Sequence, residues 1–247
     1  MTTLTTQVAI IGGGPSGLLL SQLLNRAGIE TVILERSTRA HVLSRIRAGI
    51  LEWGTVELLQ VAGVDARMQR EGIPHDGCYM TDDERMVHID FLELTGKRVM
   101  VYGQTEVTAD LYAAQDAMGT TVLHEVSDVE ILDLDQPRSA VEFTHEGTRK
   151  RLECLYVAGC DGFHGVSRKT IPEHKRQEFE RVYPFGWLGI LSETPPVNDE
   201  LIYSNSRHGF ALASMRNSNL VRYYVQVPLT DKVEDWSDQR FWDEFSR

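Results

Sequence analysis

A glycine-rich turn between an apolar run and a helical pattern constrains the fold of this chain more than any other feature. Residues 7–11 (Gln-Val-Ala-Ile-Ile) form a short apolar run typical of a buried parallel strand, and leucines repeat at helical spacing over residues 18–24. Between them, residues 12–17 (Gly-Gly-Gly-Pro-Ser-Gly) carry the spacing G-x-G-x-x-G, and a second apolar run follows at residues 31–34. This order predicts a strand–helix–strand unit with parallel strands, completed within about thirty residues.

Each glycine has a physical role in such a unit. Gly12 permits the tight turn, Gly14 lets the backbone approach a pyrophosphate, and Gly17 lets the helix pack closely against the strand. The N-terminus of the helix offers N–H groups and the positive end of its dipole to phosphates. Glu35, at the end of the second strand, can accept hydrogen bonds from a ribose 2′-hydroxyl and would repel a 2′-phosphate. We therefore expect FAD or NAD here, not NADP; the alternative is a purely structural glycine turn.

The composition restricts the classes of partner. The chain has 247 residues, with 25 Lys and Arg against 36 Asp and Glu, so its formal net charge is −11. This acidic excess argues against nucleic acid or an anionic membrane surface as a partner. No apolar run approaches the roughly 18 residues of a membrane span, and the N-terminus lacks the features of a signal peptide. Three cysteines without a C-x-x-C pair indicate reduced thiols, so we expect a soluble, cytoplasmic chain without a metal site.

The rest of the chain changes from helical to strand-like patterns. Helix signals dominate residues 42–69, and residues 105–118 have helical periodicity. Short apolar or alternating runs over residues 183–227 are typical of an antiparallel sheet. These patterns predict an α/β (α+β) fold, in which a Rossmann-like β-α-β domain is interleaved with an antiparallel-sheet substrate domain. The first domain is expected at residues 1–180, with a small inserted sheet, and the second, incomplete, at residues 181–247.

Several longer segments carry a resemblance to a known family. They are residues 44–49 (Ser-Arg-Ile-Arg-Ala-Gly), 102–108 (Tyr-Gly-Gln-Thr-Glu-Val-Thr), 159–165 (Gly-Cys-Asp-Gly-Phe-His-Gly), 180–189 and 223–229. Together with the glycine fingerprint, they resemble the single-component FAD-dependent aromatic hydroxylases, in particular the branch that hydroxylates 4-hydroxybenzoate. Family members continue beyond residue 247 with a second flavin-binding segment and a helical region. The resemblance therefore implies that the C-terminal part of the family fold is absent here.

The resemblance implies FAD as the cofactor and NADPH (or NADH) as the co-substrate. The Arg47 guanidinium suits a pyrophosphate contact, because it can pair bidentately with phosphate oxygens. His41 stands where NADPH-using relatives often carry tyrosine, so the choice between NADPH and NADH stays open. The residues assigned to the cofactors are Gly12, Gly14, Ser16, Gly17, Glu35, Arg45, Ile46, Arg47, Ala48, Gly49, Ile50, Gln104, Asp161, His164 and Arg222.

The resemblance also implies a substrate set. Arg216 would bind the substrate carboxylate, and Tyr203 would hydrogen-bond the substrate 4-hydroxyl and promote its ionisation. His75 matches the solvent-side member of the family's proton relay. Without the resemblance, tyrosines and arginines on such strands are usually cross-strand pairs, and His75 would be a surface-turn residue. The full substrate set is Tyr203, Ser214, Met215, Arg216 and Tyr224, with Tyr203 and His75 as the catalytic residues.

The implied reaction converts a small aromatic acid with O2. NAD(P)H would reduce FAD, the reduced flavin would capture O2 as a C4a-hydroperoxide, and the substrate phenolate would yield 3,4-dihydroxybenzoate. The resemblance leaves a homodimer open and implies neither nucleic acid nor membrane as a partner. Two alternatives remain: a related hydroxylase of another hydroxybenzoate or phenol, and an inactive fragment that only binds a dinucleotide.

Overall fold

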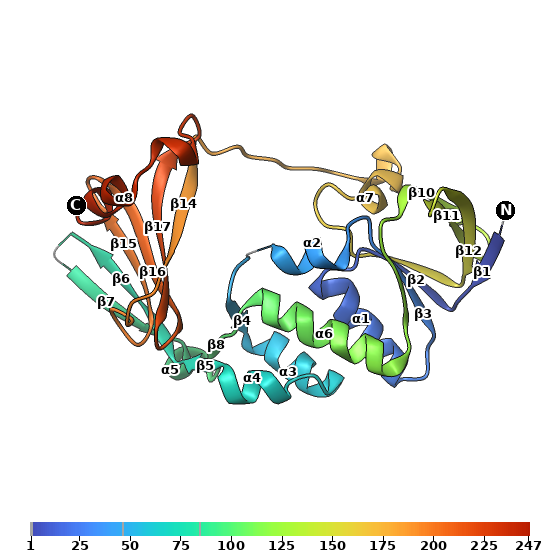
Figure 1. Ribbon diagram of the computed structural model, residues 1–247, viewed down its shortest axis with the longest axis horizontal. Helices are drawn as coiled ribbons and strands as arrows, with labels where there is room; N and C mark the ends of the chain where they lie inside the picture. Colours follow the sequence, from blue (N-terminus) through green and yellow to red (C-terminus); the bar gives the residue numbers. More distant parts are fainter. Residues whose placement is uncertain (1, 46, 84) are drawn as a thin grey trace. The chain divides into compact units, whose positions relative to one another are not determined.

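The computed structural model describes residues 2–45, 47–83 and 85–247, and the chain forms two compact units (Figure 1). The first unit comprises Met1–Ala48, Glu57–Arg70 and Gly103–Glu178, and the second comprises Gly49–Val56, Glu71–Tyr102 and Phe179–Arg247. The mixed α/β fold expected from the sequence is confirmed. The sequence-based division placed residues 1–180 in one domain, whereas the structure draws residues 49–56 and 71–102 into the unit of the C-terminal segment.

The first unit contains two four-stranded sheets. The parallel sheet has the strand order β13-β2-β3-β9, and the other has the order β1-β12-β11-β10. All or most of the following elements belong to this unit: β1 (Thr2–Thr5), β2 (Val8–Ile11), α1 (Pro15–Arg26), β3 (Thr31–Leu34), α2 (Arg39–Ser44), α3 (Trp53–Ala62), α4 (Ala66–Glu71), α6 (Gln104–Met118), β9 (Thr121–Leu123), β10 (Ser127–Leu132), β11 (Ser139–His145), β12 (Thr148–Cys154), β13 (Tyr156–Gly159), α7 (Val166–Thr170) and the short 3-10 turn η1 (Glu173–Lys175).

The core of the first unit forms because β2 and β3 are apolar on both faces. Ala9 and Ile11 pack on one face with Phe143 and Leu152 of the other sheet, and all four are buried. Helices α1 and α6 pack against each other (Figure 1). Ile10 of β2 and Leu18 of α1 are both fully buried. Burial on both faces is typical of parallel strands and holds the ends of β2 and β3 in fixed positions. The predicted strand–helix–strand unit is therefore present as β2-α1-β3.

The second unit is built on a six-stranded sheet with the order β14-β17-β16-β15-β6-β7. Its pairings are antiparallel except between β15 and β6, which run parallel. The sequence predicted an antiparallel sheet from residues 183–227, but not its extension by residues 77–90. The elements are β4 (Ile50–Glu52), β5 (Ile73–His75), β6 (Gly77–Asp82), β7 (Arg85–Asp90), α5 (Phe91–Thr95), β8 (Val99–Val101), β14 (Phe185–Ser192), β15 (Leu201–Ser206), β16 (Gly209–Asn217), β17 (Leu220–Pro228), η2 (Val233–Asp235) and α8 (Asp238–Phe245).

The two faces of the six-stranded sheet differ in their residues. On one face, Ala213, Tyr223 and Val225 form a buried apolar cluster with Phe241 of α8. Because side chains alternate along a strand, the residues between them face the other way. Paired positions share a face, so the register places Tyr224 in one row with Leu212 and Tyr203. We call this second face, defined by Tyr203, Ser214, Arg222 and Tyr224, the polar sheet face.

Candidate functional site

The glycine turn after β2 shows why two of its glycines cannot carry a side chain. Gly12 has φ +109°, and a Cβ added there would overlap the carbonyl oxygen of Cys160. A Cβ added at Gly17 would overlap the carbonyl oxygen of Gly12. Gly14 differs, because nothing lies within 4 Å of a Cβ built on it. The first two glycines thus permit chain packing, whereas Gly14 borders open space that a ligand can enter.

The N-terminus of α1 faces this space with features that favour an anion. Gly14 is the N-cap and provides no side-chain cap, and Pro15 carries no N–H. No acidic residue lies in the first turn, so no side chain of the helix itself brings a negative charge to the N–H groups of Ser16 and Gly17. This arrangement suits a phosphate group.

Glu35 holds the turn and can also receive a ligand. It is 8% exposed, and its Oε2 accepts a hydrogen bond from the N–H of Gly13 at 2.7 Å. Its Oε1 accepts from the N–H of Ser37 at 2.8 Å. Each carboxylate oxygen has a second lone pair, so the group can accept two further hydrogen bonds, as a ribose diol would donate.

Tyr112 of α6 is a residue that the sequence reasoning missed. Its hydroxyl donates to the carbonyl oxygen of Gly13 at 3.0 Å, so the turn is held at its N–H by Glu35 and at its C=O by Tyr112. Burial, with the nearby Glu35 charge, raises the pKa of Tyr112 to about 12, which keeps the hydroxyl protonated as a donor. The helical periodicity of residues 105–118 placed Tyr112 on a helix, but no motif indicated this contact.

A cavity of about 480 Å³ lies beside the turn and brings distant sequence segments together. Gly12, Glu35, Asp161 and His164 are among the residues that line it. Asp161 Oδ2 accepts hydrogen bonds from the N–H and Oγ of Ser167, at 2.9 and 3.0 Å, and so holds the start of α7. The open Gly14, the uncapped helix end and the Glu35 carboxylate border one region of the first unit. These residues fit the pyrophosphate and ribose of a dinucleotide.

Most of the remaining cofactor candidates lie in two neighbouring segments of the chain. The N–H of Gln104, the first residue of α6, donates to the carbonyl oxygen of Ala48 at 3.2 Å. The N–H of Tyr102 donates to the carbonyl oxygen of Gly49 at 2.9 Å. Residues 48–49 therefore run beside residues 102–104. Ile50 begins β4, the side chains of Arg45 and Arg47 are exposed, and Ile46 lies outside the described residues.

The polar sheet face brings most of the predicted substrate residues together. Tyr203 and Tyr224 flank Leu212 in one row, and Ser214 lies opposite Arg222 in the next. The Arg222 guanidinium carbon lies 5.3 Å from the centroid of the Tyr224 ring, and Ser214 and Arg222 are both buried. The polar sheet face therefore places a buried cation, Arg222, beside the Tyr224 ring and across from Ser214.

Two predicted substrate residues lie elsewhere in the register. Met215 is paired with Val221, whose side chain belongs to the apolar cluster under α8, so the Met215 side chain faces away from the polar sheet face. Arg216 lies where the register between β16 and β17 shifts, and its guanidinium lies against Gly49. A β-bulge of this kind re-aims the side chains beside it.

Tyr203 is suited to donate a hydrogen bond. Burial raises the pKa of its hydroxyl, with a smaller contribution from Cys78, so the group stays protonated at neutral pH. Its ring centroid lies 6.1 Å from that of Phe210. A neutral phenol in this position can donate to an anionic oxygen of a ligand.

His75 is not a surface-turn residue, because only 2% of it is exposed. Neither ring nitrogen has a hydrogen-bond partner within the described part of the chain. Burial lowers its pKa, opposed by the charges of Glu200, Asp199 and Asp76. Glu200, which the sequence reasoning missed, accepts from the N–H of Gly77 at 2.8 Å and lies 2.6 Å from Nε2 of His88. A neutral, buried imidazole with unused nitrogens is suited to proton transfer.

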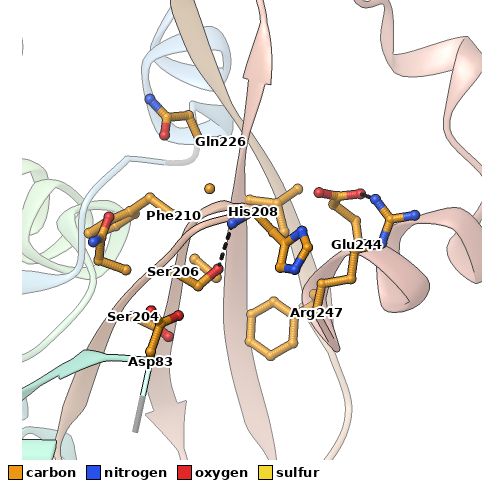
Figure 2. Close-up of a pocket in the computed structure, with 13 residues that line it drawn as sticks. Asp83, Ser204, Ser206, His208, Phe210, Gln226, Glu244 and Arg247 are labelled. Carbon is orange, nitrogen blue, oxygen red and sulfur yellow. Dashed lines mark hydrogen bonds and ion pairs between the residues drawn. The ribbon is translucent and has the colours of Figure 1, made fainter. Parts of the chain in front are cut away.

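A separate small pocket of about 170 Å³ lies in the second unit (Figure 2). Figure 2 shows His208, Ser206 and the Glu244–Arg247 ion pair around it; the pair is 3.0 Å apart. None of the predicted site residues that the structure describes lines this pocket. It therefore contributes nothing to the substrate set.

Two kinds of feature are absent from the described ranges. Over residues 2–45, 47–83 and 85–247, no three His, Cys, Asp or Glu side chains gather as metal ligands. No helix in those ranges is both long and apolar enough to cross a membrane.

Comparison with known proteins places the chain among flavoproteins. The family model described as FAD binding domain matches residues 5–247. The p-hydroxybenzoate hydroxylase of Acinetobacter baylyi is 53% identical over 246 residues, which is 99% of this chain and 60% of that protein. The probable NADH-specific resorcinol 4-hydroxylase of Rhodococcus jostii is 31% identical over 175 residues, covering 66% of this chain and 32% of that protein.

A solved structure shows the same fold. The p-nitrophenol 4-monooxygenase PnpA from Pseudomonas putida DLL-E4 has a TM-score of 0.83 at 17% identity. That match covers 100% of this chain and 63% of the other. The chain thus spans at most about two thirds of the length of these relatives.

Proposed function

Because the chain belongs to the FAD-binding-domain family, whose model matches residues 5–247, we propose that its protein is an FAD-dependent hydroxylase. The proposed reaction converts 4-hydroxybenzoate, O2, NAD(P)H and a proton into 3,4-dihydroxybenzoate, NAD(P)⁺ and water. The observation that carries this proposal is the 53% identity to a p-hydroxybenzoate hydroxylase, which extends over 99% of the chain and so includes the polar sheet face.

The first unit would hold FAD. The N–H groups at the start of α1 would bind the pyrophosphate, and Glu35 would accept from the ribose hydroxyls. Arg45, Arg47, Gln104 and the Asp161–His164 segment would contribute further contacts. When bound, the flavin supplies the redox chemistry, taking reducing equivalents from NAD(P)H and passing them to O2. The task of the protein is to position the reactants and exclude water.

The second unit would hold the substrate. Arg216 would pair with the carboxylate, aided by the hydroxyls of Ser214 and Tyr224. Tyr203 would donate a hydrogen bond to the 4-oxygen, which stabilises the phenolate, the better nucleophile at the ring. Because burial raises the pKa of Tyr203, its proton remains available for that bond. Arg222 would add positive charge close to the flavin.

His75 would carry the substrate proton towards solvent. Burial lowers its pKa, so the imidazole is neutral near pH 7 and can accept a proton. Its two nitrogens have no hydrogen-bond partner among the described residues, which leaves both open to water or a further group of the protein.

The nucleotide choice forms part of the proposal. NADPH would be preferred over NADH, recognised by Arg36 and its neighbours. Arg39 is already engaged, since its guanidinium lies 2.8 Å from the Asp116 carboxylate and 4.6 Å from the centroid of the Tyr112 ring. The ratio of kcat/KM for NADPH and NADH tests this choice, and a clear NADH preference would contradict it.

The proposed setting is the cytoplasm, with a small aromatic acid and O2 as partners and neither nucleic acid nor membrane. The net charge of −11 and the free thiols Cys78, Cys154 and Cys160 support it. A homodimer is part of the proposal and is tested by light scattering.

The decisive experiment uses the complete protein that contains this chain. It should purify with FAD and form 3,4-dihydroxybenzoate from 4-hydroxybenzoate, NADPH and O2, as measured by chromatography. Phenol and resorcinol are the informative competitors, because neither carries the carboxylate with which Arg216 is proposed to pair. If either competitor is hydroxylated faster than 4-hydroxybenzoate, that competitor and not 4-hydroxybenzoate is the substrate. A flavin-free protein would overturn the proposal as a whole.

A further inference from the structure

Gly49 lies directly against the side chain proposed to bind the substrate carboxylate. Gly49 is buried at the start of the segment that leads into β4. Its carbonyl oxygen accepts a hydrogen bond from the N–H of Tyr102 at 2.9 Å, and Tyr102 is itself buried. A Cβ added at Gly49 would overlap Nη1 of Arg216. Both residues belong to the second unit, so this contact lies within one compact body.

The backbone of Gly49 gives no reason for a glycine. Its φ lies outside the left-handed range, which other glycines such as Gly12 adopt. An L-residue could therefore take the same backbone conformation. The three nearest heavy atoms around a built Cβ are all guanidinium atoms of Arg216. The atoms closest to the position of such a side chain are thus those of the guanidinium.

We propose that Gly49 is a positioning residue that sets where the Arg216 guanidinium lies, and so tunes recognition of the substrate carboxylate. Arg216 lies at the register shift between β16 and β17, so the strand pairing alone does not fix its side chain. The Gly49 backbone, anchored by Tyr102, supplies a fixed surface on one side. This inference rests on the proposed function and deepens it; it adds a role to the cofactor contact that the resemblance implies for Gly49.

The physical consequence of a side chain at Gly49 follows from which atoms can move. Nη1 and its neighbours are the far end of a long, flexible side chain, whereas the Gly49 backbone is anchored. We therefore expect the Arg216 guanidinium to move and the backbone of Gly49 to stay in place. The effect should therefore appear in the binding of a carboxylate, because bidentate pairing depends on the position and angle of the guanidinium.

The test compares two ligands in the FAD-loaded complete protein. Gly49→Ala should raise the dissociation constant of 4-hydroxybenzoate by about tenfold and change that of the uncharged isostere 4-hydroxybenzamide much less. Both dissociation constants are measured with FAD at saturation, and the thermal midpoint should stay as in the wild type. Gly54→Ala is the matched control: Gly54 is exposed, five residues along the same segment, with nothing within 4 Å of a built Cβ.

A double-mutant cycle separates this role from general damage. In an Arg216→Met background, Gly49→Ala should change 4-hydroxybenzoate binding by less than about twofold, because the group it displaces is gone. Equal losses for the two ligands, a collapse of the thermal midpoint or an additive cycle would each overturn the inference. If the wild type binds 4-hydroxybenzoate and Gly49→Ala binds it equally well, only this inference fails. If the wild type does not bind it, the proposed function fails as well.

Discussion

The candidate sites of the two units differ in whether main-chain or side-chain groups form them. In the first unit the site consists mostly of main chain: a glycine-rich turn, the N–H groups of a helix end, and one carboxylate that holds the turn. In the second unit it consists of side chains on neighbouring strands, brought together by the register of β15, β16 and β17. Stability tolerates a substitution in this turn only where a Cβ has room, which it has at Gly14 and lacks at Gly12 and Gly17. A side-chain site can lose one group and keep its fold, so the two should fail in different ways.

The largest expected effect is at Gly17, with Gly14 as its counterpart. A methyl group at Gly17 would overlap the Gly12 carbonyl oxygen, and the Gly12 N–H is bonded to Leu34 at 2.8 Å, so neither can move easily. Gly17→Ala should lower the free energy of unfolding by about 1–3 kcal/mol and abolish FAD binding. Gly14→Ala should leave the free energy of unfolding unchanged. It should weaken FAD binding by about tenfold or more, because the added methyl group keeps the ligand from approaching the backbone closely. Calorimetry and flavin titration measure the two effects, and equal destabilisation by both variants would contradict the distinction.

Tyr203→Phe tests the side-chain site in the same terms. The ring stays and the fold should stay with it, but the hydrogen bond to the substrate 4-oxygen is lost. A bond to a charged oxygen contributes about 1.5–3 kcal/mol, so hydroxylated product per NAD(P)H consumed should fall by about tenfold, with hydrogen peroxide released instead. Product and peroxide are measured side by side. If coupling is unchanged, Tyr203 is only a strand-packing residue.

The same difference explains what the sequence could predict. The turn and its strand–helix–strand unit depend on residues within about thirty positions of one another, so Gly12, Gly17 and Glu35 could be assigned from spacing alone. On the polar sheet face, the strand register brings Tyr203 and Tyr224 into one row. The same strand β15 also pairs with β6, where Tyr203 lies opposite Met80, over a hundred residues earlier in the chain. Strand periodicity does not specify such partners. Only the family resemblance pointed to those side chains.

The sequence alone could not show which way some side chains point or what they contact. Met215 sits between two substrate candidates in sequence, yet alternation turns its side chain to the other face. Tyr112 shows no motif, because its role is a single hydrogen bond to a turn about a hundred residues away. His75 looked like a turn residue because Pro74, Asp76 and Gly77 surround it, and only the packing of β5 buries it.

Tyr112→Phe sharpens the comparison on the main-chain side. The variant leaves the Gly13 carbonyl without its hydroxyl donor, and a buried hydrogen bond of this kind contributes about 1 kcal/mol. We expect the free energy of unfolding to fall by about that amount. FAD affinity should fall a few-fold, because Gly13 is then held only through its N–H. Tyr156→Phe is the matched control, because Tyr156 is 71% exposed in the same unit. Identical behaviour of the two variants would remove Tyr112 from the site.

The smallest expected effect concerns His75 and appears only as pH falls. Burial lowers the pKa of His75 below its ordinary value of 6.5, so between the two values the unfolded chain binds a proton that the folded chain does not. Stability then rises with pH in that range: the contribution is fully present above 6.5 and is lost as pH falls below it. His75→Gln, which cannot titrate, should remove this dependence, so that the wild type loses stability relative to the variant as the pH falls from about 7 to about 5.5. Urea unfolding at the two pH values measures it, with His174→Gln as the control because His174 is exposed in η1. Parallel pH profiles for wild type and His75→Gln would mean that the imidazole is solvated or partnered, and the proton-relay role would lose its structural support.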